Sequence, residues 1–188
     1  FSDEAYKKSV GVDVLHGEKG FTTLERIGIR PTFDVCGIQG GYSGEGFKTI
    51  IPSVAWAKLS FRLVACQDPE RIAKLVEDYF RSICPDSVKI DFTYYEKGMP
   101  YVCPIDLPEY RAAEQAFMDT YGMQPIPAHS GCSISIVSDF EQELGIKSIL
   151  LGFGLGADNI HAPNENYRLD RFFKGIETAV AFFKHYGE

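Results

Sequence analysis

The residues best suited to chemistry lie near the end of the chain. His161 follows a glycine-rich loop and is flanked by Asp158, Pro163, Asn164 and Glu165. A neutral imidazole is a common zinc ligand, and a stiff loop holds it in one orientation. A hydrogen-bonded surface histidine is the alternative, but the polar residues on both sides favour a site. We therefore expect a site at His161, and metal binding is one role that an imidazole there could have.

The elements next to this loop should position it. Residues 146–151 (IKSILL) predict a short buried strand, and ligands bind at loops that follow the strands of open α/β sheets. Residues 170–186 predict a closing helix, because apolar side chains recur at spacings of three and four. Its expected buried face consists of Phe172, Phe173, Ile176, Val180 and Phe183.

The first half of the chain has a different pattern. Residues 31–37, 54–65 and 88–95 alternate as strands do, and the run 69–84 predicts a helix that begins at the N-cap Asp68. Weaker helical patterns cover the segments 3–9 and 22–27. Alternating strands with helices between them indicate an antiparallel sheet with helices on one face.

A cluster of helix and strand breakers separates the two halves. It consists of Gly98, Pro100, Pro104 and Pro108. We place a domain boundary there, with one domain at residues 1–103 and a second at 104–188. Beyond the cluster, the predicted helices 108–121 and 135–144 alternate with short strands, one of them at 126–132, in the manner of an α/β domain.

Two glycine motifs imitate nucleotide-binding loops. The segment 41–49 resembles a phosphate-binding loop, but Phe47 is inserted before Lys48 and a strand follows where a helix is needed. The segment 152–156 has the glycine spacing of a dinucleotide site, but residues 158–163 cannot open a helix. Neither motif therefore indicates a nucleotide.

Composition excludes further classes of partner. The net charge is −7 with a pI near 5.1, and the absence of a Lys/Arg stripe argues against nucleic acid. No apolar run is long enough to suggest a membrane span. The five cysteines are scattered without a CxxC pair, which favours reduced thiols and a cytoplasmic location.

An ordered set of motifs resembles the zinc-dependent amidohydrolases and peptidases that include acetylornithine deacetylase, succinyl-diaminopimelate desuccinylase and the carnosine-type dipeptidases. The dipeptidase branch is the most similar. The matching segments are Arg30-Pro31-Thr32, Gly37 to Gly41, Gly46 to Pro52, Ala57 to Val64, Gln67-Asp68-Pro69, Gly131 to Ile134 and His161 to Glu165.

The resemblance implies a fold of α+β and α/β parts. Residues 1–103 would form most of a ferredoxin-like lid, an antiparallel sheet with helices on one face that also mediates dimerisation. Residues 104–188 would be the closing part of an α/β zinc-peptidase catalytic domain. The chain begins with Phe1 rather than Met, so we expect it to be the C-terminal half of a longer enzyme.

The resemblance also implies roles for individual residues. His161 would bind one of two zinc ions, Arg62 the substrate carboxylate, and Thr49 would donate a hydrogen bond to the substrate. Gly131 and Ser133 would hold the C-terminal end of the substrate. The catalytic carboxylate and the other metal ligands have no counterpart here, so no catalytic residue is expected in this chain.

Three positions depart from the family pattern. Cys132 replaces a glycine, His129 stands where Arg is common, and Ser135 stands where Pro is usual. A nucleophilic Cys132 activated by His129 would need a third, orienting group, and the sequence supplies none. The departures therefore bear on substrate specificity more than on fold.

Two functions remain to be compared. The first is half of a zinc-dependent, dipeptidase-like enzyme, inactive alone, that forms a homodimer and hydrolyses an amide bond next to a free carboxylate in a small peptide or an N-acyl amino acid. The second is a non-catalytic dimerisation or interaction module.

Overall fold

The computed structural model describes residues 2–131 and 134–187, and the chain divides into two compact units. Unit 1 comprises residues 1–101 and 129–138, and unit 2 comprises residues 102–128 and 139–188. The assignment of residues 1–103 to a lid and of 104–188 to a catalytic domain stays a prediction.

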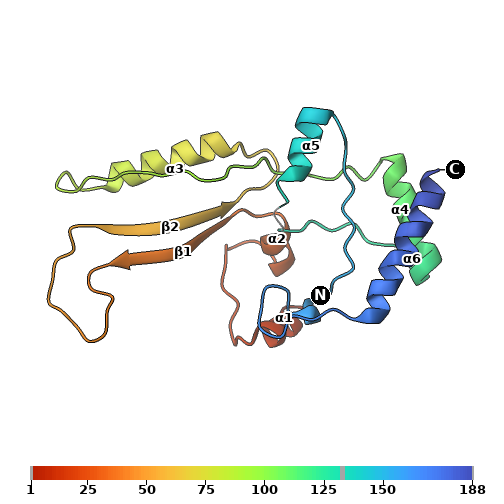
Figure 1. The fold of residues 1–188 in the computed structure, drawn as a ribbon, viewed down its shortest axis with the longest axis horizontal. Coiled ribbons are helices and arrows are strands. Elements are labelled where there is room, and N and C mark those ends of the chain that lie inside the picture. Colours follow the sequence, from red (N-terminus) through yellow and green to blue (C-terminus); the bar gives the residue numbers. More distant parts are fainter. Residues whose placement is uncertain (1, 132–133, 188) are drawn as a thin grey trace. The chain divides into compact units, whose positions relative to one another are not determined.

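Unit 1 contains a β-hairpin (Figure 1). Strand β1 (Thr32–Gly40) pairs antiparallel with β2 (Ala55–Arg62), and a bulge interrupts the register after Val35. Phe33 lies opposite Phe61, and their rings stack with centroids 5.0 Å apart. Both predicted strands are confirmed, the first longer and the second shorter than expected.

Helix α3 (Pro69–Ile83) begins where its capping signals predict. The Asp68 carboxylate accepts the Arg71 N–H at 2.7 Å, and Pro69 occupies the first turn, where its missing N–H costs nothing. The helix ends before Cys84. This local chemistry makes α3 predictable from the sequence.

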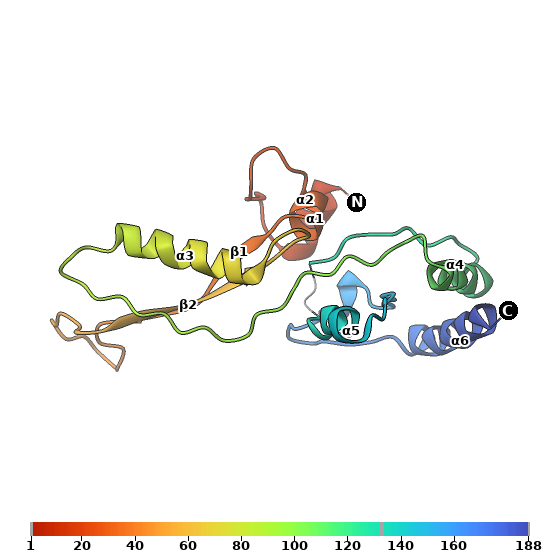
Figure 2. The same ribbon diagram turned by 90° about the horizontal axis from the view of Figure 1, so that it is seen from above.

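The predicted strand at 88–95 is wrong. The segment is extended and runs beside α3, but it belongs to no β-ladder among the described residues (Figures 1 and 2). Alternation tells which residues share a face, whereas a ladder also needs a neighbouring strand to accept and donate backbone hydrogen bonds.

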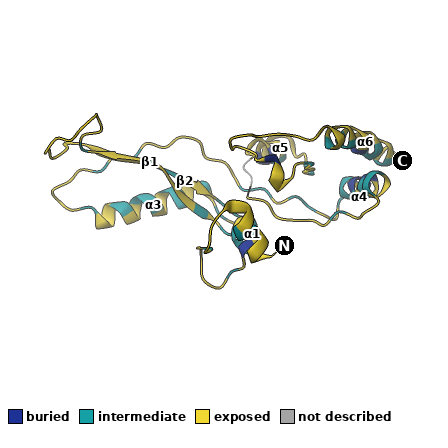
Figure 3. Ribbon diagram, turned by 90° about the horizontal axis from the view of Figure 1, so that it is seen from below, coloured by how far each residue is buried: buried dark blue, intermediate teal, exposed yellow. Residues whose placement is uncertain are grey.

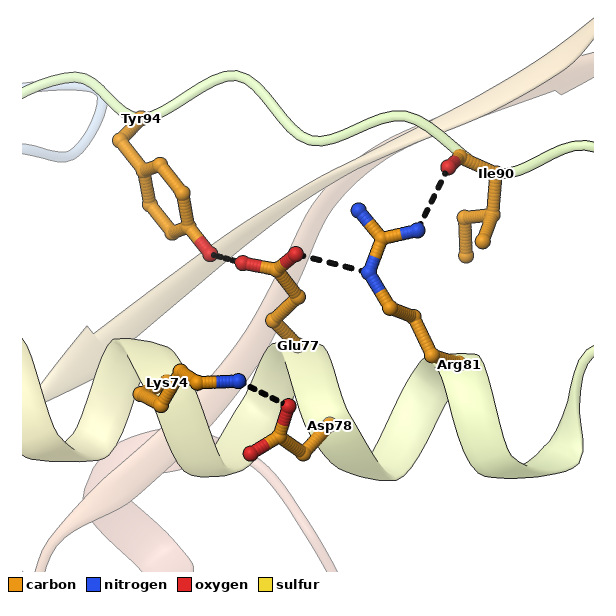
Figure 4. A network of polar contacts seen from close by, with 6 residues as sticks. All are labelled: Lys74, Glu77, Asp78, Arg81, Ile90 and Tyr94. Carbon is orange, nitrogen blue, oxygen red and sulfur yellow. Dashed lines mark hydrogen bonds and ion pairs between the residues drawn. The ribbon is translucent and has the colours of Figure 1, made fainter.

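Side chains hold this segment against α3 instead (Figure 4). The Tyr94 hydroxyl donates to Glu77 at 2.6 Å, and Arg81 donates to the same carboxylate at 2.7 Å. Arg81 also donates to the Ile90 carbonyl at 3.2 Å and lies 5.1 Å from the centre of the Phe92 ring. The segment is thus fixed through polar and cation–π contacts to one helix.

Two short helices precede the hairpin, both close to their predicted positions. Helix α1 spans Asp3–Val10 and α2 spans Thr23–Gly28. The buried Thr23 hydroxyl donates to Asp3 at 2.6 Å and so links the two helices.

Unit 2 is built on two helices that lie side by side, α4 (Pro108–Tyr121) and α6 (Leu169–Tyr186) (Figures 1 and 2). Both were predicted, as was α5 (Ile136–Leu144), which begins in unit 1 and ends in unit 2. A 3-10 turn, η1, covers Gly156–Asp158. The buried residues of α4 and α6 are small: Ala112, Ala113, Ala116 and Thr178 (Figure 3).

Three expectations for the second half are wrong. Residues 126–131 and 146–151 form no strand in the described part of the chain, and Ile146 and Leu150 are each 53% exposed. The apolar face of α6, which was expected to be buried, is exposed. Its members are Phe172, Phe173, Ile176, Val180 and Phe183. Periodicity shows which residues share a face, but it cannot show whether another element covers that face.

The fold is therefore a mixture of helices with one two-stranded antiparallel sheet among the described residues. None of its described helices combines the length and the apolar character needed to cross a bilayer.

Candidate functional site

Two of the predicted substrate-binding residues contact each other in unit 1. Arg62 ends β2, and its guanidinium Nη1 donates to the Gly131 carbonyl at 3.1 Å, although 69 positions separate the two residues. Arg62 is exposed, and Thr32 lies opposite it across the hairpin. The fold thus places a planar cation beside the backbone of the predicted substrate-binding loop.

The backbone around Gly131 explains why a glycine is needed there. A Cβ at this position would lie 2.8 Å from the Ile27 carbonyl oxygen, which is closer than van der Waals contact allows. Gly28 makes a similar close approach, since a Cβ there would lie 3.1 Å from the His129 carbonyl oxygen. The end of α2 therefore supports the loop from one side while Arg62 contacts it from β2.

Thr49 is not part of this cluster. It is exposed in the loop 41–54, which joins the strands at the end of the hairpin opposite Arg62 (Figure 1). Ala55 and Arg62 are the two ends of β2, which puts them about 23 Å apart at the usual rise of a strand. One dipeptide cannot span that length. Ser133 and Cys132 lie outside the described residues.

His161 lies in an exposed turn of unit 2. The predicted loop position is confirmed, but the preceding segment is not a strand. The His161 backbone has a φ of 63°, in the left-handed region that few non-glycine residues adopt. Asn159 and Asn164 share this conformation, with φ values of 52° and 64°. These residues lie in two successive turns. The Ala162 N–H donates to the Asn159 carbonyl at 2.9 Å, and the Glu165 N–H donates to the Ala162 carbonyl at 3.2 Å.

Asp158 is bonded to the backbone of its own loop. It is 3% exposed, and its carboxylate accepts the Leu155 N–H at 2.6 Å. The Asp158 carbonyl accepts the Asn166 N–H at 2.9 Å. Glu165 lines an open depression together with Asp158, Ile160 and Tyr167.

The described residues can supply one ligand of a zinc site, but not the whole set. An imidazole nitrogen is a suitable donor, but a catalytic zinc needs three protein ligands. Within the described residues, no group of three or more His, Cys, Asp or Glu side chains is arranged to hold a metal ion. His161 is therefore a candidate for a single ligand.

Sequence reasoning missed two features of these sites. The first is the direct contact between Arg62 and the Gly131 carbonyl, for which no local signal exists because it joins distant segments. The second is the set of left-handed residues around His161. The asparagines at 159 and 164 were a usable signal, since Asn adopts this conformation more readily than most residues.

Comparison with known proteins supports the resemblance. The profile described as Peptidase family M20/M25/M40 matches residues 3–185. The Cys-Gly metallodipeptidase dug1 of Schizosaccharomyces pombe is 32% identical over 186 residues, covering 97% of this chain and 39% of the relative. The Beta-Ala-His dipeptidase of Homo sapiens is 25% identical over 183 residues, covering 96% and 36%. The chain thus spans about two fifths of the length of these relatives.

Solved structures give the same result. The M20 family metallo-carboxypeptidase Sso-CP2 of Sulfolobus solfataricus superposes with a TM-score of 0.84 at 29% identity, covering 99% of this chain and 42% of that one. The di-peptidase Dug1p of Saccharomyces cerevisiae gives a TM-score of 0.79 at 27% identity, with 99% and 40% covered. Since the family profile spans nearly the whole sequence and these folds match over nearly its whole length, the chain belongs to peptidase family M20/M25/M40.

Proposed function

We propose that this chain is part of a zinc-dependent peptidase of the dipeptidase type, which hydrolyses an amide bond next to a free carboxylate. The contact between Arg62 and the Gly131 loop carries the proposal, because it puts a cation with planar geometry beside a backbone carbonyl. Two of the relatives above are dipeptidases by name, which supports a small peptide over a protein as substrate. An N-acyl amino acid would present the same carboxylate.

The chemistry of the guanidinium suits this role. Its N–H groups form a planar fork that can meet both oxygens of a carboxylate, and such charge-assisted pairs are about twice as strong as neutral hydrogen bonds. Gly131, and Ser133 beside it, would hold the same end of the substrate through the loop. Binding at this end would place the neighbouring amide bond at a fixed distance from the site.

His161 would supply one neutral nitrogen to a zinc ion, and its fixed turn would keep that nitrogen in place. When bound, zinc would polarise the amide carbonyl and lower the pKa of a water. The other ligands and the general base would come from residues outside this chain. We call the protein that carries all of them the complete enzyme. In it, residues 1–103 would form most of a ferredoxin-like lid and 104–188 the closing part of the α/β catalytic domain.

The length of the hairpin suggests how Thr49 takes part. If Arg62 holds the substrate at one end of β2, then Thr49, beyond the other end, cannot reach the same molecule. We infer that it reaches the site of a second copy, which is consistent with a homodimer formed through the lid. The cytoplasmic location stays a prediction from the cysteine pattern.

Kinetics of the complete enzyme test the proposal. A dipeptide with a free carboxylate and its amide-capped analogue should be compared in the parent, Arg62→Lys and Arg62→Ala. Losing a hydrogen bond to a charged group costs about 1.5–3 kcal/mol, which is roughly tenfold to a hundredfold in kcat/KM. In both variants kcat/KM should fall by this factor for the free-carboxylate dipeptide and stay unchanged for its amide-capped analogue. Lysine should not rescue the activity, because one ammonium cannot replace the planar fork of the guanidinium.

The control is Arg71→Ala, which removes the same charge from the surface of α3. If both Arg62 variants keep the parental preference for the free carboxylate, Arg62 is only a strand residue and the proposal is wrong. If the complete enzyme shows no hydrolysis but still dimerises, the non-catalytic module is the better description.

A further inference from the structure

Asp158 is the one buried residue in an exposed loop. All its neighbours from Leu155 to Tyr167 are exposed, whereas Asp158 is 3% exposed. Burying a carboxylate is unfavourable unless hydrogen bonds replace its water. Here the Leu155 N–H supplies such a bond at 2.6 Å. The carboxylate is thus committed to the backbone of its own loop.

The same residue joins the two ends of this loop. Its N–H donates to the Leu155 carbonyl at 3.0 Å, and its carbonyl accepts the Asn166 N–H at 2.9 Å. Together with the carboxylate bond, these contacts tie residue 155 to 158 and residue 158 to 166. A compact surface loop closed in this way is an Ω-type loop, and such loops are often functional.

Between the tied ends lies strained backbone. Asn159, His161 and Asn164 all have positive φ, a conformation that persists in non-glycine residues only when the surrounding structure holds it. Within this segment the turns are closed by the Ala162 N–H to Asn159 carbonyl and Glu165 N–H to Ala162 carbonyl bonds, and the ties at Asp158 fix the two ends of the segment. Asp158 is therefore placed to hold the backbone on both sides of His161.

We propose that Asp158 is a positioning residue: it closes the 155–166 loop through its carboxylate and so fixes the backbone that presents the His161 imidazole. Asp158 does not touch the metal in this account, and acts only through the loop. The inference rests on the proposed function in one respect, the role of His161 as a zinc ligand.

The first test needs no metal. In the purified 188-residue chain, the one-bond Cα–Hα coupling of His161 and its intraresidue amide–Hα contact report the sign of φ, and hydrogen exchange reports the Leu155 and Asn166 amides. Asp158→Ala should abolish the positive φ of His161 and the protection of both amides. Asp158→Asn keeps an acceptor oxygen for the Leu155 N–H and should preserve them.

The second test is zinc affinity of the complete enzyme, measured by competition with a chelator. Residues that orient metal ligands typically contribute about tenfold or more to affinity, so Asp158→Ala should weaken zinc binding by about this factor. Asp158→Asn should stay close to the parent, which separates positioning from direct ligation or simple charge. The control Asp139→Ala, which removes an exposed carboxylate on α5, should have no effect.

The outcomes are distinguishable. If His161 keeps its positive φ in Asp158→Ala, or if Asp158→Asn weakens zinc binding as much as Asp158→Ala, the positioning role is refuted. If His161→Ala leaves zinc affinity unchanged, the proposed metal ligand is wrong, and the φ measurement still decides the role of Asp158. Exchange rates in α6 serve as a check that each variant is folded.

Discussion

The seam between α4 and α6 offers a quantitative test of how unit 2 is held together. The Thr178 side chain is completely buried, and its hydroxyl lies 2.9 Å from the Thr120 hydroxyl on the facing helix. Each hydroxyl also contacts a carbonyl of its own helix, Thr178 that of Lys174 at 2.8 Å and Thr120 that of Ala116 at 2.7 Å. Two protons serve these three contacts, so one hydroxyl donates across the seam and the other donates to its own helix carbonyl while accepting the interhelical hydrogen bond; either threonine can be the interhelical donor.

Replacing one or both threonines by valine removes this bond while the volume is kept. A neutral hydrogen bond contributes about 0.5–1.5 kcal/mol net, so Thr178→Val should lower the stability of the seam by that amount. Thr120 keeps its bond to the Ala116 carbonyl, so no buried donor is left unpaired. The double variant should lose less than the sum of the single variants, with a coupling of roughly 0.5–1 kcal/mol, because the second change removes a bond already broken.

Native-state hydrogen exchange of α6 amides measures the stability of this unit directly. Thr178→Ser, which keeps the hydroxyl and loses a methyl group, is the matched control for packing. Strictly additive effects of the two valine changes would show that the hydroxyls do not interact across the seam. A larger loss for serine than for valine would show that packing, rather than the hydrogen bond, holds the helices together.

Two further predictions concern other parts of the chain. The hydrogen bond from Tyr94 and the neighbouring Arg81 hold the pKa of Glu77 below its ordinary value of 4.5. Because the pKa of Glu77 is lower in the folded than in the unfolded chain, its ionised carboxylate stabilises the folded state. That stabilisation is present above the unfolded pKa and is lost as the pH falls through the folded pKa. Tyr94→Phe should raise the pKa of Glu77 in an NMR titration of its carboxyl carbon, and an unchanged value would contradict the contact. Separately, the 188-residue chain should retain no tightly bound pair of zinc ions after dialysis and should not hydrolyse a dipeptide panel. Two zinc equivalents per chain, or turnover that His161→Ala removes, would overturn that expectation.

Helices were predictable from the sequence because their signals are local. Asp68 with Pro69 at the start of α3 and Gly122 at the end of α4 act on the backbone next to them, whatever the rest of the chain does. The Gly122 φ of 68° is the left-handed conformation in which many helices end. Strands were less predictable, because 88–95 and 146–151 have suitable patterns but no neighbouring strand among the described residues.

The candidate sites show the same division. The resemblance to a family pointed to Arg62, Gly131 and His161 as candidates through motifs in a fixed order, without any knowledge of distance. It could not tell that Arg62 contacts the Gly131 carbonyl or that Thr49 lies at the far end of the hairpin, since both depend on register and long-range packing. The buried state of Asp158 was equally invisible, because turn residues of this type are usually exposed.

Zinc content of the complete enzyme tests the central claim most directly. Metal analysis of the purified protein should be compared for the parent, His161→Ala and the control His16→Ala, which changes an exposed histidine of unit 1. We expect His161→Ala to lose zinc together with dipeptide hydrolysis, while the His16 variant keeps both. Parental zinc content and activity in His161→Ala would contradict the account.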